Sequence, residues 1–439
     1  MKALCPTCGK LVDAREITNS DEIYLERECP EHGITKTHIA DSAEYWKWSM
    51  KYNRPGSKPF RWSSEVKDGC PNDCGLCSNH KQHSCIAIAE ITGQCNLRCP
   101  ICFASAPYGD HVPFDQVVDM INSFVSYETN PEILQLSGGE PTLHPEIVEI
   151  IKYAKGLGIE DVVLSTNGLE LLDETFSKDL ADVEVVIYLQ FDTFKSETSK
   201  ILRGVDLVEK KEQIVENCAK YDLTTVLVPT IVKGINDNEI GALTNYALSK
   251  NHIFGINFQP LSFTGRVEPK GISSLSVHEI LTHIEQQTLG TLKVEHFRPI
   301  PCPHPHCTAI SYMIVDDENI IPMTELVDVD DYIDYAKDRT LVGKSTILDS
   351  AFESLFSTSA VPGTNKNLVS FCEACGMSVP EFLGKSVKTV AVHAFMDHNT
   401  YQLERAQKCC IHVIQPDGRM IPFCNLNLFD RYVRGGNTE

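Results

Sequence analysis

The sequence has no long hydrophobic run and few basic residues, and each absence excludes a class of protein. No stretch of its 439 residues reaches the roughly 18 uninterrupted apolar residues that a transmembrane helix needs. Its 39 lysines and arginines stand against 60 aspartates and glutamates, a formal net charge of −21. Because phosphate binding depends on basic side chains, we expect no nucleic acid among the partners.

The start of the chain also lacks the features of a secretory signal. Residues 1–4 lead directly into a cysteine instead of an apolar segment. We therefore expect a cytoplasmic protein, in which disulfides are improbable. Eighteen cysteines grouped at short spacings favour metal ligation in that compartment. Only Cys218 lies in the long middle of the chain, on an amphipathic segment where a buried inert thiol is expected.

The middle of the chain alternates β-branched runs with helix-like segments and contains no internal repeat. The six runs are AIAEITG, EILQLSGGE, DVVLSTNG, VEVVIYLQF, TTVLVPTIV and GINFQPL. Helix-like segments such as HPEIVEIIKYAKGLG follow them. This order predicts an α/β fold of parallel βα units, as either a partial barrel or an open doubly wound sheet. In both folds the loops after the strand ends carry the chemistry.

Three motifs occupy these strand ends. CNLRCPICFA follows the first run with Cys95, Cys99 and Cys102, SGGEP follows the second run, and STNG follows the third. Three thiolates are one too few for a closed tetrahedral metal site, and by themselves they could be zinc ligands or part of a structural cluster. A double glycine lets a small ligand approach the backbone, and the adjacent carboxylate can accept an amine.

In this order and spacing the motifs resemble the radical S-adenosylmethionine (radical SAM) superfamily over about residues 85–290. The resemblance implies a partial (βα)6 radical SAM barrel in which Cys95, Cys99 and Cys102 hold a 4Fe-4S cluster. S-adenosylmethionine would take the open iron, and its reductive cleavage would give a 5′-deoxyadenosyl radical. A low-potential electron donor such as ferredoxin or flavodoxin would supply the electron.

The resemblance also implies which residues hold the cofactor. Gly138, Gly139 and Glu140 would meet the methionyl amine. Ser165 and Asn167 would lie near the carboxylate or ribose. Arg203 would reach the carboxylate or the ribose hydroxyls of S-adenosylmethionine, and Gln259 would contact the edge of its adenine. One departure is Ile101, because the residue before the third cysteine is often aromatic in this superfamily.

The flanks carry further cysteine sets. CPTCGK and CPEHG supply a Cys3His set that suits either structural zinc or rubredoxin-like iron. GCPNDCGLCSNHKQHSC supplies four thiols, enough for a closed auxiliary 4Fe-4S cluster. The first set is Cys5, Cys8, Cys29 and His32, and the second is Cys70, Cys74, Cys77 and Cys85.

The C-terminal part holds seven thiols, of which four suffice for another cluster. We favour Cys302, Cys307, Cys409 and Cys424, with Cys410 as the substitute for Cys409. Cys372 and Cys375 either share in that cluster or form an unligated turn. The expected inventory is therefore S-adenosylmethionine, three 4Fe-4S clusters and one mononuclear iron or zinc.

Together the flanks resemble the archaeal tetraether lipid synthases and their radical pterin methylase-like relatives. This implies an enzyme that joins the terminal methyl carbons of diether lipid chains into tetraether (GDGT-type) lipids. It also implies a membrane diether lipid substrate and peripheral contact with the inner face of the membrane. The alternative is a radical SAM methylase acting on a pterin or other small heteroaromatic substrate, which needs a pocket of paired donors and acceptors. A non-catalytic iron–sulfur carrier is disfavoured by the GGE motif.

The motifs divide the chain into four regions. Residues 1–66 contain the Cys3His site, 67–85 an auxiliary cluster segment, 86–295 the barrel, and 296–439 a C-terminal auxiliary cluster domain.

Overall fold

Six parallel strands form the centre of the molecule, and they coincide with the six β-branched runs of the sequence. They are β5 (Ile86–Thr92), β6 (Ile133–Gly138), β7 (Asp161–Thr166), β8 (Val186–Leu189), β9 (Thr225–Leu227) and β11 (Ile253–Pro260). The computed structural model describes residues 1–267, 271–316, 319–326, 328–330 and 387–430. Each of the six strands pairs in parallel with the next along the chain. The predicted α/β fold with a partial (βα)6 barrel is confirmed.

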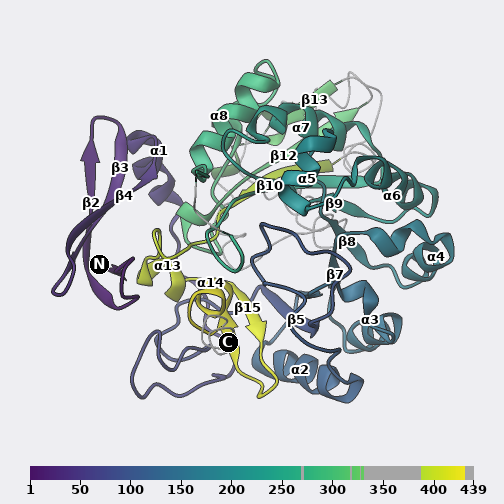
Figure 1. Ribbon diagram of the computed structural model, residues 1–439, viewed down its shortest axis with the longest axis horizontal. Helices are drawn as coiled ribbons and strands as arrows, with labels where there is room; N and C mark the ends of the chain where they lie inside the picture. Colours follow the sequence, from purple (N-terminus) through teal and green to yellow (C-terminus); the bar gives the residue numbers. More distant parts are fainter. Residues whose placement is uncertain (268–270, 317–318, 327, 331–386, 431–439) are drawn as a thin grey trace.

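Amphipathic helices cover the outer face of these strands (Figure 1). They are α2 (Phe114–Tyr127), α3 (Ile147–Gly156), α4 (Glu174–Asp182), α5 (Ser196–Arg203), α6 (Val208–Lys220), α7 (Ile240–Ser249) and α8 (Val277–Gln287). In α3 the buried residues Ile147, Ile150, Ile151 and Ala154 recur at intervals of three and four, so they share one helical face. Packing of such faces against the sheet leaves the strand-end loops together at one end of the barrel.

Two strands from the C-terminal part of the chain lengthen the parallel sheet at both edges. β14 (Val387–His393) lies parallel beside β11, and β15 (Ile411–Ile414) lies parallel beside β5. Antiparallel strands finish the edges: β12 (Thr308–Asp316) and β13 (Asn319–Pro322) beyond β14, and β16 (Met420–Pro422) beyond β15. Eight parallel strands therefore stand side by side, two more than the βα units that the sequence predicts.

The N-terminal residues form a separate four-stranded antiparallel sheet that projects from one side of the molecule (Figure 1). Its strands are β1 (Lys2–Leu4), β2 (Leu11–Asn19), β3 (Glu22–Cys29) and β4 (Gly33–Ala40), and α1 (Ala43–Ser49) follows them. Leu4 packs against Met396 and Tyr401, and Arg27 donates a hydrogen bond to the carbonyl oxygen of Asn399. The C-terminal segment therefore anchors the N-terminal sheet.

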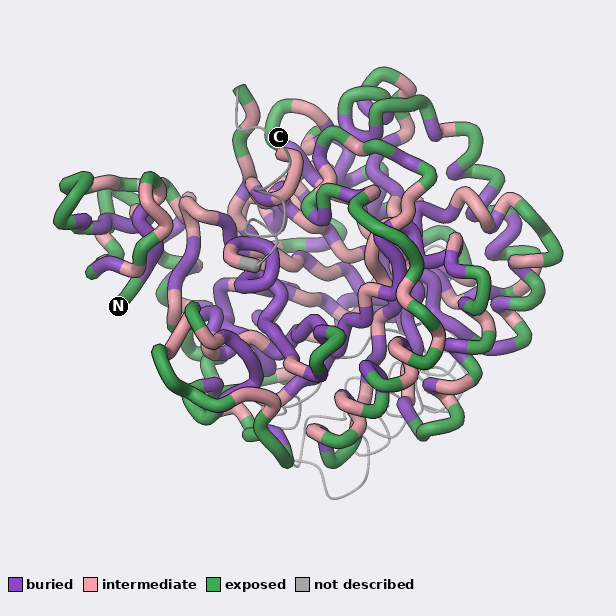
Figure 2. The backbone as a smooth tube through the Cα atoms, turned by 60° about the horizontal axis from the view of Figure 1, so that its bottom comes forward, coloured by how far each residue is buried: buried purple, intermediate pink, exposed green. Residues whose placement is uncertain are grey.

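The main hydrophobic core lies between the barrel strands and their helices, where Figure 2 shows continuous buried chain. Cys218 is fully buried in this core, as expected. Among the described helices, none combines the length and the apolar character needed to cross a bilayer. Cys372 and Cys375, for which two possibilities were left open, lie outside the described residues. The four-region division of the chain remains a prediction.

Candidate active site

The three cysteines of the CNLRCPICFA motif lie in the loop after β5, which we call the cluster loop (residues 93–107). Cys95, Cys99 and Cys102 are all partly buried there. Burial, with smaller contributions from the nearby Glu140, Cys99 and Cys102 groups, raises the pKa of the Cys95 thiol to about 11. Burial likewise raises the pKa of Cys99. Three partly buried thiols in one loop are a donor set that fits the iron–sulfur cluster implied by the sequence.

Gly138 and Gly139 end β6 directly against the cluster loop. The backbone N–H of Gly139 donates to the carbonyl oxygen of Thr92 (2.8 Å), and that of Glu140 donates to Gln94 (2.7 Å). Gly138 has a φ of +129°, and a Cβ there would lie 2.2 Å from the Thr92 oxygen. A Cβ on Gly139 would lie 2.1 Å from the Gln94 oxygen. The close approach of the two strand ends therefore requires both glycines, and their contact with the methionyl amine remains a prediction.

The Glu140 carboxylate is buried and ties the end of β6 to the end of β7. It accepts hydrogen bonds from the hydroxyls of Thr142 and Thr166, both at 2.6 Å, and from the backbone N–H of Asn167 at 2.7 Å. Burial raises the pKa of this carboxyl. These three bonds make Glu140 support the neighbouring turn, and its contact with the methionyl amine remains a prediction.

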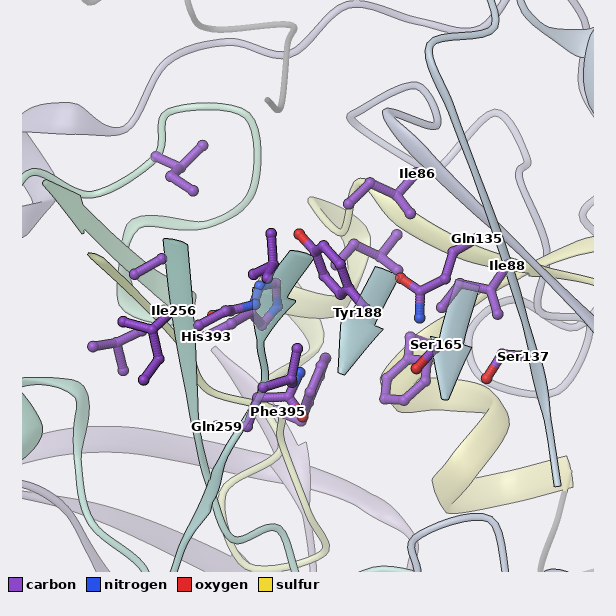
Figure 3. Close-up of a pocket in the computed structure, with 18 of the residues that line it drawn as sticks. Ile86, Ile88, Gln135, Ser137, Ser165, Tyr188, Ile256, Gln259, His393 and Phe395 are labelled. Carbon is purple, nitrogen blue, oxygen red and sulfur yellow. The ribbon is translucent and has the colours of Figure 1, made fainter. Parts of the chain in front are cut away.

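The other predicted cofactor residues separate into ligand-accessible and protein-bonded groups. Ser165 and Gln259 line the barrel interior (Figure 3). Asn167 is engaged by protein: its side-chain N–H donates to the Asn96 side chain (2.7 Å), and its oxygen accepts from the backbone N–H of Leu169 (2.9 Å). Ser165 and Gln259 are thus open to a ligand, and Asn167 shapes the turn that holds Ser165.

Arg203, at the end of α5, is held by a carboxylate beside the cluster loop. Its guanidinium donates to both oxygens of Asp192 (2.7 and 2.6 Å) and to the Thr230 hydroxyl (3.2 Å). Although burial raises the pKa of Cys99, the Arg203 charge and its hydrogen bond to the thiol act to lower it. Because charge and hydrogen bonds around the sulfurs tune iron–sulfur potentials, Arg203 is placed to act on the cluster.

A cavity of about 1020 Å³, open space at its mouth included, occupies the barrel interior (Figure 3). Ile88 of β5 and Ala391 of β14 both line it, so the sheet curves around it. Most of the wall is apolar, but Gln135, Asn257 and Gln259 bring amide groups into it. Within the described residues the buried side-chain oxygen of Asn257 has no hydrogen-bond partner. Such an oxygen is costly when unpaired, and a ligand N–H would satisfy it.

Three phenylalanines, which we call the aromatic wall, stand at one end of this cavity. The Phe395 and Phe423 ring centroids are 4.5 Å apart, and Phe103 of the cluster loop lies 5.4 Å from Phe423. The same rings and Gln259 also line a second cavity of about 440 Å³, whose walls include Ile101. The aromatic wall therefore lies between the barrel interior and the space beside the cluster loop.

The predicted Cys3His set is assembled in the N-terminal sheet. The ligating atoms of Cys5, Cys8, Cys29 and His32 all lie within 4.8 Å of one another. The Nδ1 atom of His32 is 3.4 Å from the Cys29 sulfur and 3.7 Å from the Cys5 sulfur. Three sulfurs and one imidazole at these separations suit a tetrahedral zinc or iron site.

A second ligand group joins cysteines that the sequence analysis assigned to different sets. The sulfurs of Cys85, Cys302 and Cys410 lie within 4.8 Å of one another and are buried. The Cys85 and Cys302 sulfurs lie at bonding distance from each other, contrary to our expectation that disulfides are improbable here. Their Cα atoms are 7.7 Å apart, beyond the usual limit of about 6.8 Å for a disulfide. Only the reduced thiols could bind a metal together with Cys410, and the wide Cα separation suits that arrangement better. The Gln82 side chain donates to the Cys302 sulfur at 3.2 Å.

The two predicted auxiliary sets are therefore intermixed. The pairing of β15 with β5 brings residues 409–424 beside residues 70–85. Asn425 accordingly donates a hydrogen bond to the Cys74 sulfur at 2.9 Å. The sets Cys70, Cys74, Cys77, Cys85 and Cys302, Cys307, Cys409, Cys424 are not gathered as two separate groups in the part of the chain that the structure describes. Spacing along the chain could not reveal a regrouping that depends on strand pairing.

Sequence reasoning missed several residues of this site. Asp192 directly follows the VEVVIYLQF run, so its strand-end position was a usable signal. Gln135 and Asn257 are amide residues within runs that are otherwise apolar. Because a buried amide needs hydrogen-bond partners, its presence in such a run indicates that the strand faces a cavity. Lys211 of α6 is buried and donates to the backbone oxygens of Asn167 and Gln190, a role that nothing in its helical context indicates.

Comparisons with known proteins give the superfamily and a relative that spans nearly the whole chain. Residues 89–247 match the radical SAM superfamily, and residues 1–41 match the N-terminal zinc ribbon domain of the HMPTM type. A 7,8-dihydro-6-hydroxymethylpterin dimethyltransferase of Methanocaldococcus jannaschii is 33% identical, over 98% of this chain and 93% of that protein. A probable GTP 3′,8-cyclase of Saccharolobus islandicus is 28% identical over 48% of this chain and 68% of that protein. The solved structure of SuiB of Streptococcus suis bound to S-adenosylmethionine is 16% identical, with a TM-score of 0.39, covering 48% of this chain and 49% of that chain.

The prediction of tetraether lipid synthesis is contradicted. The relative that spans nearly the whole chain is a pterin dimethyltransferase, and this matches the alternative prediction. The motifs behind the lipid interpretation are those predicted to hold the cluster and the other metals, so they report the cofactor chemistry and not the substrate. The cavity wall is instead assembled by strand pairing from residues that are distant in the sequence.

Proposed function

This chain belongs to the radical SAM superfamily, in the family of the pterin dimethyltransferase of M. jannaschii, and from that premise we propose that it is a radical SAM methyltransferase of a pterin or a similar small heteroaromatic compound. The observation that carries the proposal is the 33% identity over 98% of the chain, because it includes both cysteine-rich flanks and the barrel. A match to the barrel alone would support only the cofactor chemistry.

The barrel cavity supports a substrate of this class. A pterin presents alternating hydrogen-bond donors and acceptors along its ring edges, and amide side chains offer both kinds of group. Asn257 and Gln259 lie two residues apart on β11, so both face the cavity, and Gln135 faces it from β6. The unpaired Asn257 oxygen would accept a ring or amino N–H. The apolar remainder of the wall would hold the ring faces.

The cofactor would lie between the cluster loop and the aromatic wall. When bound, a 4Fe-4S cluster and S-adenosylmethionine supply a carbon radical that removes a hydrogen atom from an unactivated carbon. Cys95, Cys99 and Cys102 would hold the cluster, and Gln259, which lines both cavities, would orient cofactor and substrate toward each other. The rings of Phe103, Phe395 and Phe423 would exclude water from the reacting atoms.

Further metal belongs to the same proposal. The zinc ribbon match and the ligand group of Cys5, Cys8, Cys29 and His32 support a mononuclear metal in the N-terminal sheet. The Cys85, Cys302 and Cys410 group supports an auxiliary cluster. We expect three clusters in total, with the remaining cysteines of residues 70–77 and 307–424 supplying the ligands of the third.

The test is a turnover assay with 7,8-dihydro-6-hydroxymethylpterin. Reconstituted protein, S-adenosylmethionine as the radical source, a one-carbon donor (a second S-adenosylmethionine or a methylene-tetrahydropterin) and a strong reductant should give 5′-deoxyadenosine and methionine together with a pterin heavier by one or two methyl groups, detected by mass spectrometry. A Cys102→Ala variant is the control and should give neither product. An Asn257→Leu variant should keep 5′-deoxyadenosine formation and lose the methylated pterin. Cleavage of S-adenosylmethionine with no modification of any pterin tested would contradict the proposed substrate.

A further inference from the structure

An exposed segment lies directly over the loop of residues 70–85, which follows it in the chain and carries Cys70, Cys74, Cys77 and Cys85. This segment, which we call the basic strap, comprises residues 53–67. The backbone N–H of Ser63 donates to the carbonyl oxygen of Leu76 (2.8 Å), and the N–H of Leu76 donates back to the Ser63 hydroxyl (3.1 Å). Further along the loop, the N–H of His83 donates to the carbonyl oxygen of Ser57 (2.7 Å). These contacts fix the basic strap against residues 74–85.

The loop beneath the basic strap leads to the buried thiols. Leu76 lies between Cys74 and Cys77 in the chain, so the Ser63 contacts reach the backbone of that cysteine pair. Gln82, beside His83, is fully buried and donates to the Cys302 sulfur. A protein seated on the basic strap would therefore be one layer of chain away from the sulfurs that we propose as metal ligands.

The charge of the basic strap is opposite to that of the molecule. It holds four basic residues and one acidic residue, whereas the whole chain carries 60 acidic against 39 basic residues. Lys58, Arg61 and Lys67 are exposed, and within the described residues none of the three forms an ion pair. A concentrated positive surface on an acidic protein attracts and orients an acidic partner.

Exposed aromatic rings lie among these charges. Phe60 is 67% exposed and Trp62 is 38% exposed. The Lys58 ammonium lies 6.0 Å from the Trp62 ring centroid, and the Arg61 guanidinium lies 5.5 Å from that of Phe60. Aromatic and arginine side chains at the centre of an interface contribute most to protein–protein affinity.

We propose that the basic strap is the docking surface for an acidic, low-potential electron-transfer protein, and that the electron enters through the cysteine sites beneath it. The proposal rests on the proposed radical chemistry, which consumes one external electron for each S-adenosylmethionine cleaved. The carrier is oxidised by one electron and the enzyme's metal centres are reduced by one. That electron ends in the broken C–S bond, which yields methionine and the carbon radical.

An anionic membrane is the competing occupant of a basic aromatic surface. The position of the basic strap over the thiols favours the carrier, because electron transfer weakens steeply with distance whereas membrane binding gains nothing from nearby sulfurs.

The test compares two electron sources in a charge-reversal variant. Lys58→Glu, Arg61→Glu and Lys67→Glu are combined in the holoenzyme, and 5′-deoxyadenosine is measured without any pterin. With reduced flavodoxin, an acidic FMN carrier, we expect the concentration for half-maximal rate to rise about tenfold or more and its dependence on salt to weaken. With dithionite, a small reductant that needs no docking, the rate should equal that of the wild type.

A matched control carries the same change of charge elsewhere. Lys152→Glu, Lys178→Glu and Lys210→Glu lie exposed on α3, α4 and α6, and their combination should leave the flavodoxin dependence unchanged. If the triple strap variant also loses rate with dithionite, the milder Lys58→Gln, Arg61→Gln, Lys67→Gln variant is titrated with flavodoxin by calorimetry, and unchanged affinity would overturn the proposal. Equal flavodoxin dependence in the wild type and the triple variant would also overturn it. So would a triple variant that loses binding to anionic vesicles while its dependence on flavodoxin stays that of the wild type. Absence of pterin methylation would leave this result unaffected, since the assay contains no pterin.

Discussion

At the scale of single residues, the site depends on charges that are buried in pairs or held by oxygen atoms. Arg203 and Asp192 are both almost fully buried, and the guanidinium donates two hydrogen bonds to the carboxylate, so the two charges compensate each other. Removing one member of such a pair leaves an uncompensated charge, which costs more than the pair contributes. Arg203 therefore cannot be exchanged without consequence even if no ligand contacts it.

An Arg203→Met variant should be less stable by about 3–5 kcal/mol, because Asp192 keeps a buried negative charge with no cation beside it. Urea unfolding followed by circular dichroism measures this difference. The double variant Arg203→Met, Asp192→Asn is the control and should recover much of the loss, because no charge then remains unpaired. A single variant as stable as the wild type would contradict the structural role of this pair.

Lys211 gives the free energy of unfolding a specific pH dependence. Burial lowers the pKa of its ammonium to about 7 in the folded protein, against about 10.4 in the unfolded chain. Between these two pKa values Lys211 is protonated in the unfolded chain and neutral in the folded protein. The free energy of unfolding therefore rises with pH in this range: the contribution of Lys211 is full above about pH 10.4 and is lost as the pH falls to about 7.

Relative to Lys211→Met, the wild type should therefore gain stability from pH 7 to pH 9 by up to about 1.4 kcal/mol per pH unit. Unfolding curves at several pH values measure the slope. The neighbouring Lys210→Met, at an exposed position of the same helix, should keep the wild-type slope. Parallel curves for wild type and Lys211→Met would disprove the assignment.

At the scale of elements, the ends of the parallel strands hold the site because backbone there approaches backbone. β6 ends against the cluster loop only because residues 138 and 139 have no Cβ. Glu140 then accepts hydrogen bonds from the turn after β7, and Arg203 of α5 pairs with Asp192, which lies three residues after β8. Hydrogen bonds from one strand end therefore hold the loop at the next.

A Gly138→Ala variant should lose stability by roughly 1–3 kcal/mol or more, because its φ of +129° is unfavourable with a Cβ and the added atom meets the Thr92 oxygen. It should also hold less cluster iron after reconstitution. Gly156→Ala at the end of α3 is the comparison, since a Cβ there meets nothing within 4 Å, and it should be neutral or stabilising by about 0.4–1 kcal/mol. Thermal unfolding and iron analysis of both variants decide the matter.

At the scale of the whole molecule, the C-terminal segment completes both the barrel sheet and the candidate ligand group of Cys85, Cys302 and Cys410. Residues 387–430 supply β14 and β15 at opposite edges of the sheet, two rings of the aromatic wall, and Cys410. They also hold the N-terminal sheet through Met396 and Tyr401. The cysteine-rich flanks are therefore one structural region, although they lie at opposite ends of the sequence.

Because Cys85, Cys302 and Cys410 converge, replacing any one of them with alanine should remove the same cluster. Each variant should lose about four iron atoms and the same electron paramagnetic resonance signal, while reductive cleavage of S-adenosylmethionine by the cluster loop persists. Cys218→Ala, at the buried thiol of α6, is the control and should keep the full iron content. Full iron content in Cys410→Ala would show that this thiol is not a ligand.

The sequence by itself determined the features that depend on local patterns. Six β-branched runs alternating with amphipathic segments predict the parallel barrel. The spacing of apolar residues that distinguishes a strand from a helix is set by residues close together in the sequence, so it can be read there. Short spacings likewise define the Cys95 loop and the Cys3His site, because their ligands sit on one or two turns of chain.

Only the tertiary structure decided which distant residues share a site. The pairing of β15 with β5 places Cys410 beside Cys85 and Cys302, and no spacing encodes that contact. Asp192 is brought to Arg203, and Asn257 to the cavity of Gln135, by the curvature of the sheet. The substrate prediction failed for the same reason: the predicted cofactor motifs are contiguous in sequence, whereas the wall of the cavity that we propose for the substrate is assembled from several separate strands.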